Sequence, residues 1–171
     1  MAETILGGIK RRALQEVAKI APGATSVRVA LHKARGVRIG ERVWIGYGAV
    51  LETAHPELIE LEDGVSIGIR VTIIAHFRET TGVLIERDAF IGPGVIVLPN
   101  VVVGRGAVVT AGSVVSRSIP PMTLAQGNPA VPIAECGVAL TPDVTLKEFS
   151  RRLRPLPRRA SGETSTGEPR A

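Results

Sequence analysis

Apolar residues recur every six positions along this chain from Val37 to about Val131, and glycine directly follows several of them. A small or branched residue comes four positions after most of these aliphatic residues. Two inward-facing residues in every six, with a glycine near each bend, suit short strands joined by tight corners. A helix would need apolar residues at positions i, i+3, i+4 and i+7 together, and that combined spacing does not recur here. The pattern therefore predicts a parallel β-solenoid. The recurring aliphatic positions are Ile39, Ile45, Leu51, Leu61, Ile67, Ile73, Ile85, Ile91, Val97, Val103, Val109 and Val115.

The repeat is interrupted twice, and both interruptions fall at the same point of its cycle. Ten positions separate Leu51 from Leu61, and twelve separate Ile73 from Ile85. If three repeats make one turn, both excursions leave the end of the third face, so one edge of the coil carries His55 and His76. We expect the functional site at this edge, because irregular loops on a rigid scaffold are where function concentrates.

The segments outside the repeat predict short helices. An imperfect helical pattern over Glu3–Ile20, ended by Ala21-Pro22-Gly23, suggests a cap over the first coil, and Thr145–Leu153 suggests a short helix that packs on the solenoid. We expect four parts: a helical cap (1–25), the solenoid (26–133), an extension with a short helix (134–154) and a disordered basic tail (155–171).

Composition and charge narrow the class of protein. The chain has 171 residues, of which 44% are hydrophobic and 3% aromatic, and this suits a narrow prism filled by aliphatic side chains. The formal net charge is +5, but six arginines and two glutamates follow position 150, so the basicity belongs mostly to the tail. We therefore expect no nucleic-acid partner. No apolar run reaches the roughly 20 residues that span a bilayer, and the single cysteine, Cys136, excludes an intramolecular disulfide. We expect a cytoplasmic protein without a membrane partner.

Several short motifs between Val71 and Ile133 resemble the hexapeptide-repeat acyltransferases. They include Ile91-Gly92-Pro93-Gly94, Ala111-Gly112-Ser113 and Gly127-Asn128-Pro129-Ala130, in family order. The resemblance implies an all-β solenoid, namely a left-handed parallel β-helix with short helical segments at the N- and C-termini. It also implies a homotrimer that uses acetyl-CoA as co-substrate. The left hand comes from the resemblance alone, because the spacing of residues does not reveal it.

The resemblance gives His76 the role of general base. In the family, a histidine at such an excursion takes the proton from an acceptor group as that group attacks the thioester carbonyl of an acyl-coenzyme A. The imidazole group suits this task because it exchanges protons near neutral pH. The alternative is an exposed loop histidine without a function.

Three more residues are candidates for the acceptor site. By the repeat register, His55 and His76 lie about one coil apart on the same edge, and Asn100 follows one coil later. Glu52 belongs to the same group, and either Glu52 or Glu79 could orient an imidazole. The alternatives are structural: Asn100 suits a left-handed corner, and His55-Pro56 suits a turn.

The resemblance also places residues of the later coils against coenzyme A. By this resemblance, Phe90 and Pro93 would flank the pantetheine arm, and Ala111 and Gly112 would offer backbone groups. The nucleotide end would lie near Ser116, Arg117 and Asn128. The guanidinium of Arg117 is well suited to bind a phosphate there.

Other functions remain as alternatives. The γ-type carbonic anhydrases share this architecture but use three histidines on zinc, whereas this chain has only three in all, and His32 falls near a different corner by the register. We therefore expect no metal. The expected activity is transfer of an acetyl group from acetyl-CoA to a hydroxyl of a small, sugar-containing acceptor. The alternatives are N-acetylation of an amino sugar and a non-catalytic role in assembly.

The sequence disfavours two related activities. The long N-terminal helical region of serine acetyltransferases has no counterpart in this sequence, so we expect an acceptor other than serine. The sequence also lacks the long C-terminal helical extension of the lipid enzymes that use acyl-carrier protein, so a long acyl donor is disfavoured.

Overall fold

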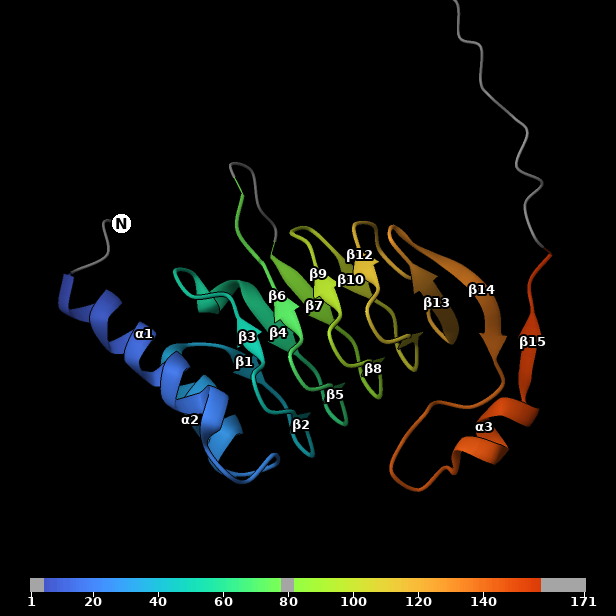
Figure 1. Ribbon diagram of the computed structural model, residues 1–171, viewed down its shortest axis with the longest axis horizontal. Coiled ribbons are helices and arrows are strands. Elements are labelled where there is room, and N and C mark those ends of the chain that lie inside the picture. Colours follow the sequence, from blue (N-terminus) through green and yellow to red (C-terminus); the bar gives the residue numbers. More distant parts are fainter. Residues whose placement is uncertain (1–4, 78–81, 158–171) are drawn as a thin grey trace, which may run out of the picture.

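The structure is a computed structural model that describes residues 5–77 and 82–157, and it is a three-sided parallel β-solenoid (Figure 1). The register of the predicted faces is confirmed, because Ile39, Leu61, Ile85 and Val103 come from the four strands of one sheet. The first sheet contains β1 (Arg38–Ile39), β4 (Ile59–Leu61), β7 (Val83–Ile85) and β10 (Val102–Val103). The second contains β2 (Trp44–Ile45), β5 (Ser66–Ile67), β8 (Phe90–Ile91), β11 (Val108–Val109), β13 (Thr123–Gly127), β14 (Ala130–Cys136) and β15 (Leu153–Pro155). The third contains β3 (Val50–Leu51), β6 (Thr72–Ile73), β9 (Ile96–Val97) and β12 (Val114–Val115).

The interior of the prism is filled by the aliphatic residues of the six-residue repeat. These side chains are almost completely buried, and they form one continuous cluster along the solenoid. The coils stack so closely that a Cβ atom on Gly68 would lie 2.6 Å from the backbone nitrogen of Pro93. Glycine is therefore required at this corner by the approach of the next coil.

Each coil donates its backbone N–H groups to carbonyls of the following coil. On the third sheet, for example, Val50 donates to Val71 O and Glu52 donates to Ile73 O, both at 2.8 Å. The corresponding carbonyls of the first coil, those of Ala49 and Leu51, have no preceding coil. They need donors from elsewhere, because a buried carbonyl without a partner is costly.

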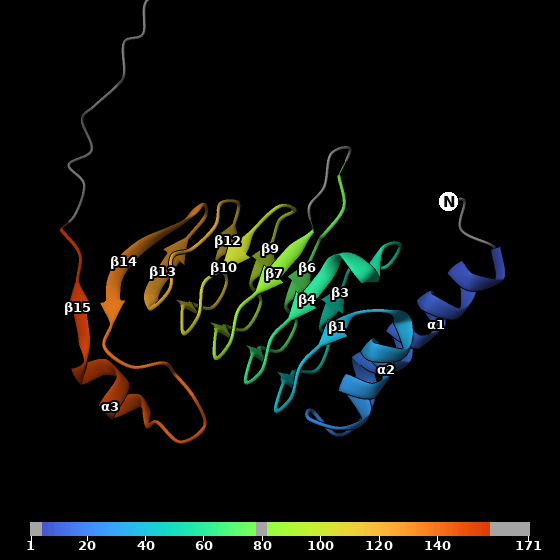
Figure 2. The ribbon, with the colours of Figure 1, turned by 180° about the vertical axis from the view of Figure 1, so that it is seen from behind.

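Two helices cover this end of the solenoid and supply the missing donors (Figures 1 and 2). They are α1 (Ile5–Ile20) and α2 (Val27–Arg35). The Gln15 side chain donates to Ala49 O at 2.9 Å, and the Arg35 guanidinium donates to Leu51 O at 3.0 Å. The cap is therefore a polar one, built to satisfy the open edge of a sheet.

The exposure pattern of α1 agrees with this polar contact. Leu6, Ile9 and Ile20 are exposed, whereas Gln15 is 1% exposed. The second helix lies beyond the predicted cap boundary at residue 25, within the range assigned to the solenoid. His32 belongs to α2 and is completely buried, so the prediction that it lies near a corner of the coil is wrong.

The far end is closed by a hairpin and a returning segment. After the hairpin of β13 and β14, the chain passes through α3 (Leu146–Arg151) and pairs β15 against β14. Phe149 packs with Val108 and Cys136 over the outer side of the second sheet, and burial raises the pKa of the Cys136 thiol to about 11. The ordered chain extends past the predicted start of the tail at 155, because Leu156 N donates to Ile133 O. The remainder of the predicted tail, 158–171, lies outside the described residues.

None of the helices in the described ranges is both long enough and apolar enough to cross a membrane.

Candidate active site at the histidine edge

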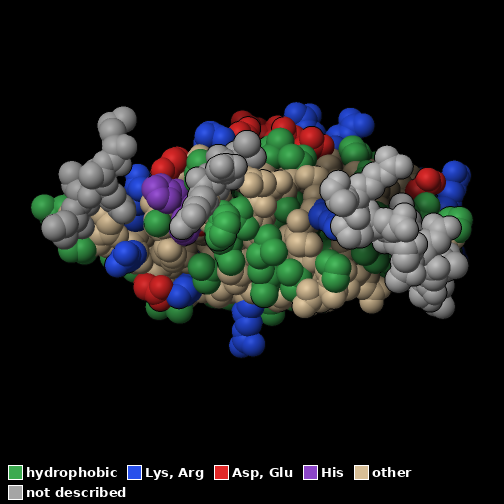
Figure 3. Space-filling model, turned by 90° about the horizontal axis from the view of Figure 1, so that it is seen from above, with side chains coloured by type: hydrophobic (Ala, Val, Ile, Leu, Met, Phe, Trp, Pro, Cys, Tyr) green, Lys and Arg blue, Asp and Glu red, His purple; other side chains and the backbone are tan. Residues whose placement is uncertain are grey.

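The third and first sheets meet at the edge that carries both excursions. We call this the histidine edge; it comprises residues 52–58, 74–77, 82, 98–101 and 116–118. The 3₁₀ helix η1 (Pro56–Leu58) belongs to the first excursion. Figure 3, which views the molecule from this side, shows histidine side chains gathered toward one end, beside a band of hydrophobic side chains. Acidic and basic side chains gather along the upper border of the molecule in this view.

The two predicted histidines lie together here. The rings of His55 and His76 have centroids 5.5 Å apart and meet edge to face at 61°. His55 Nδ1 lies 3.3 Å from Glu57 Oε1 on the exposed surface, whereas His76 Nδ1 lies 2.7 Å from Glu52 Oε2. Only His76 therefore has a buried carboxylate as its partner.

Glu52 is fixed by hydrogen bonds at every polar atom of its side chain. Oε1 accepts from Ala54 N at 2.9 Å and from His55 N at 3.4 Å, while Oε2 accepts from Ala75 N at 3.0 Å in addition to the histidine. The side chain of Glu52 is 2% exposed. Burial acts to raise the pKa of Glu52, but the hydrogen bonds from His76, Ala75 and Ala54 outweigh it and lower the pKa to about 2.

An ionised Glu52 determines the tautomer of His76. A carboxylate without a proton can only accept, so His76 Nδ1 must carry the hydrogen of this bond. In neutral imidazole the other nitrogen, Nε2, is then the acceptor. No hydrogen bond within residues 5–77 and 82–157 occupies Nε2, and the side chain is half exposed. The arrangement can take a proton from a group that approaches the histidine edge.

Of the two carboxylates predicted as candidates for orienting an imidazole, the structure places Glu52 against His76. Glu79 lies outside the described residues. Because both oxygens of Glu52 are engaged and buried, its position supports orientation of the imidazole rather than contact with an acceptor.

Asn100 lies on the histidine edge with a left-handed backbone, at φ 63°. Its N–H donates to Gly82 O at 3.0 Å, and the residue lines a pocket of about 260 Å³ together with Leu58 and Leu84. This pocket opens beside the first sheet. Of the three polar residues predicted to share this edge, His55 and His76 are in contact, and Asn100 lines the pocket farther along the same edge.

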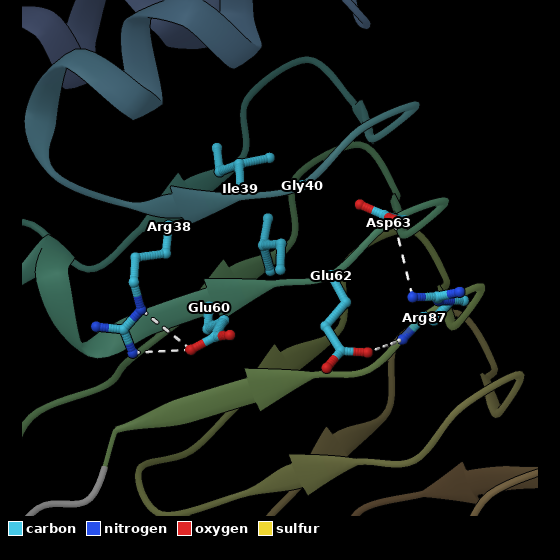
Figure 4. A pocket seen from close by; sticks show the side chains of 8 residues that line it. Arg38, Ile39, Gly40, Glu60, Glu62, Asp63 and Arg87 are labelled. Carbon is cyan, nitrogen blue, oxygen red and sulfur yellow. Dashed lines mark hydrogen bonds and ion pairs between the residues drawn. The ribbon is translucent and has the colours of Figure 1, made fainter.

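A second pocket, of about 310 Å³, lies on the first sheet and is lined by charged residues (Figure 4). Two ion pairs lie in it: Arg38 pairs with Glu60 at 2.9 Å, and the Arg87 guanidinium lies 3.8 Å from Asp63. Glu62 accepts from the backbone N–H of Arg87. The pocket is thus lined by three carboxylates and two guanidiniums, and none of the residues predicted for the acceptor or the donor lies in it.

The residues predicted to bind coenzyme A are divided among three places. Ala111 and Gly112 form an exposed corner between the second and third sheets, where the Gly112 N–H donates to Pro93 O at 2.9 Å. Asn128 lies in the turn after Gly127, whose N–H donates to Ser113 Oγ, so this turn adjoins the same corner. Four of the seven residues predicted to bind coenzyme A are therefore neighbours at this corner: Pro93, Ala111, Gly112 and Asn128.

The other three predicted residues lie elsewhere. Ser116 and Arg117 are exposed on the histidine edge, across the third sheet from the Gly112 corner. Phe90 packs in the cluster of Phe149 and Val108 over the second sheet. Phe90 is partly buried there, and its place beside the pantetheine arm stays a prediction.

Sequence reasoning missed the polar network beneath the first coil, formed by Gln15, His32 and Arg35. The available signal was polar residues on the helix faces that a cap would bury. No group of three potential metal-binding side chains occurs in the part of the chain that the structure describes.

Comparisons with known proteins agree with the repeat. The sequence profile of the bacterial transferase hexapeptide family (six repeats) matches residues 82–117. A Schizosaccharomyces pombe protein named "Putative acetyltransferase" is 39% identical over 99 residues, which cover 57% of this chain and 42% of the yeast protein. The chain thus matches less than half the length of this curated relative.

Solved structures share the fold. The hexapeptide-repeat acetyltransferase VCA0836 of Vibrio cholerae superimposes with a TM-score of 0.62 at 22% identity, covering 79% of this chain and 93% of that one. A galactoside acetyltransferase in complex with coenzyme A superimposes with a TM-score of 0.54 at 20% identity, covering 76% and 80%. At these identities the likeness concerns the fold. With the repeat and the three-sided coil, these matches show that the chain contains hexapeptide repeats and has the left-handed β-helix fold of these acetyltransferases.

Proposed function

We propose that this protein is an acetyltransferase that moves the acetyl group of acetyl-CoA to a hydroxyl of a small, sugar-containing acceptor. The observation that carries the proposal is the His76–Glu52 pair, a half-exposed imidazole held by a buried carboxylate. The V. cholerae relative has been solved with acetyl-CoA, and the galactoside enzyme with coenzyme A, which supports the choice of donor.

The proposed reaction uses His76 Nε2 as the base. It takes the proton of the acceptor hydroxyl as that oxygen attacks the thioester carbonyl, and the tetrahedral intermediate then expels the coenzyme A thiolate. The imidazolium returns the proton to the sulfur, so the enzyme ends in its starting state. Glu52 holds Nδ1–H throughout and stabilises the positive charge that forms on the ring.

An acceptor screen tests the function directly. Purified protein is incubated with acetyl-CoA and panels of sugars, amino sugars and amino acids, and the release of free thiol is measured. Turnover with hydroxyl acceptors supports the proposal, and turnover only with amino sugars would indicate N-acetylation instead. Absence of acceptor-dependent thiol release across all panels would leave the assembly role as the better explanation.

We further propose that the active form is a homotrimer. The apolar side chains of Ile74, on the histidine edge, and Ile96, on the third sheet, are 37% and 38% exposed, and a neighbouring subunit could cover them and close a donor groove. Light scattering of the active protein is expected to give three times the chain mass of 18.0 kDa. A monomer mass for active protein would contradict the trimer.

For the donor site, Arg117→Ala is expected to raise the KM for acetyl-CoA roughly 10- to 100-fold with little change in kcat. A guanidinium–phosphate contact far from the reacting carbonyl contributes uniform binding, and its loss is worth about 1.5 to 3 kcal/mol. Steady-state kinetics measure both parameters, and a truncation after residue 157 serves as the control. If the truncation raises the KM and Arg117→Ala does not, the basic tail rather than Arg117 holds the nucleotide.

A further inference from the structure

Arg35 is a buried cation placed directly beneath the residue that holds His76. The residue is 2% exposed, and its guanidinium donates to two successive carbonyls: Nη1 to Leu51 O at 3.0 Å and Nη2 to Glu52 O at 2.5 Å. The first of these contacts replaces the missing preceding coil. The second reaches the main chain of Glu52.

The guanidinium is itself anchored on both helices of the cap. It belongs to the last turn of α2, its Nε donates to Arg11 O at 3.1 Å, and its Nη1 donates to Gln15 Oε1 at 2.5 Å. Burial acts to lower the pKa of Arg35 to about 10, and the Glu52 carboxylate opposes this effect. Arg35 therefore remains charged at neutral pH.

Glu52 is consequently fixed from two sides. Its N–H donates to Ile73 O and its carbonyl accepts from Arg35, so its main chain is held by the next coil and by the cap. Its carboxylate, held by the N–H groups of Ala54 and Ala75, reaches His76 from this fixed main chain. Small errors in such a position are expensive, because a displacement of about 1 Å can cost on the order of 100-fold in rate.

We propose that Arg35 is a positioning residue of the active site: it fixes the main chain of Glu52 so that the carboxylate stays against His76 Nδ1. The helical cap thus supports catalysis as well as closing the solenoid. This inference rests on the proposed function for its effect on rate, but the geometry that it describes does not.

Arg35→Lys is a conservative variant that tests the two parallel hydrogen bonds of the guanidinium. A lysine at position 35 keeps the positive charge but offers a single ammonium in place of two parallel N–H groups, so it cannot serve both carbonyls in the same way. Arg28→Lys is the matched control. Arg28 lies on the same helix and is 3% exposed, but it stacks on Tyr47, with its guanidinium 4.0 Å from the ring centre.

The kinetic test compares these two variants. Arg35→Lys is expected to lower kcat about 10- to 100-fold with a KM for acetyl-CoA within a few-fold of the parent. Arg28→Lys is expected to leave kcat within a few-fold. In a Glu52→Gln background, Arg35→Lys should have little further effect on kcat, because both residues act through the same contact. A full additional loss in that background would mean that Arg35 acts through general stability, and would overturn the proposal.

A spectroscopic test works without any activity. The Nδ1–H of His76 should give a downfield proton NMR signal, identified by its loss in His76→Ala, and this signal is expected to weaken or shift in Arg35→Lys but not in Arg28→Lys. If Arg35→Lys does not fold, Gln15→Met, which removes the side-chain acceptor of the guanidinium, should shift the signal in the same direction. An unchanged signal in every folded variant of Arg35 or Gln15 would overturn the proposal. A changed signal in a protein whose activity survives His76→Ala would support the positioning role and reject the proposed mechanism.

Discussion

His76→Ala is expected to lower kcat by about 100-fold or more while the affinity for coenzyme A stays nearly unchanged. General bases usually contribute 10²- to 10⁴-fold, and the residues predicted to bind coenzyme A lie on later coils than His76. The Glu52 carboxylate fixes Nδ1 as the donor nitrogen and leaves Nε2 to take the acceptor proton. The measurement is steady-state kinetics with saturating acetyl-CoA, together with a binding titration of coenzyme A.

His55→Ala is the matched comparison for this experiment. The two imidazoles are neighbours and equally exposed, but the His55 ring pairs with Glu57, whose side chain is 48% exposed. We expect a clearly smaller loss of kcat from this variant. A reversed order, with His76→Ala within a few-fold of the parent and His55→Ala strongly impaired, would transfer the role of base to His55.

The second large effect concerns stability in acid. Burial, followed by the charges of Arg35 and Arg28, lowers the pKa of His32 to about 3. The unfolded chain binds a proton at this residue below about pH 6.5, whereas the folded chain does not until about pH 3. His32 therefore leaves the free energy of unfolding unchanged above about pH 6.5 and lowers it progressively as the pH falls from 6.5 toward 3. The slope approaches about 1.4 kcal/mol per pH unit, so His32 alone should cost about 3 kcal/mol between pH 6.5 and pH 4.

His32→Gln removes this proton without adding a charge. Urea unfolding of both proteins at several pH values between 7 and 4 is expected to show a smaller loss of free energy of unfolding in the variant. Carboxylates such as Glu52 contribute equally to both proteins, so the difference between the two curves isolates His32. Parallel curves would mean that His32 is protonated in the folded state near its usual pH.

The six-residue period was sufficient to predict the solenoid and the register of its three faces. Each inward position must be small or aliphatic because the prism is narrow, and this requirement is written directly into the spacing of residues such as Ile67, Ile91 and Val109. The two interruptions likewise predicted that His55 and His76 share one edge, since strands in parallel register stack equivalent positions.

The local sequence did not predict how the ends of the solenoid are closed. The pattern of α1 predicted a cap over the first coil but not its polar contacts: the first coil presents open carbonyl groups, and Gln15 and Arg35 are buried to satisfy them. Phe90 packs in one cluster with Phe149 of the C-terminal extension, a contact that the local sequence does not indicate. Both outcomes depend on segments distant in the chain.

What the sequence determined by itself was the repeating interior, because inward and outward positions alternate within six residues and need no knowledge of distant contacts. What only the tertiary structure decided was the choice of Glu52 as partner of His76 and of Arg35 as partner of Glu52. These residues are separated by 24 and 17 positions, respectively. Their contacts arise because the coil brings one excursion onto the next and because the cap must supply hydrogen bonds to the first coil.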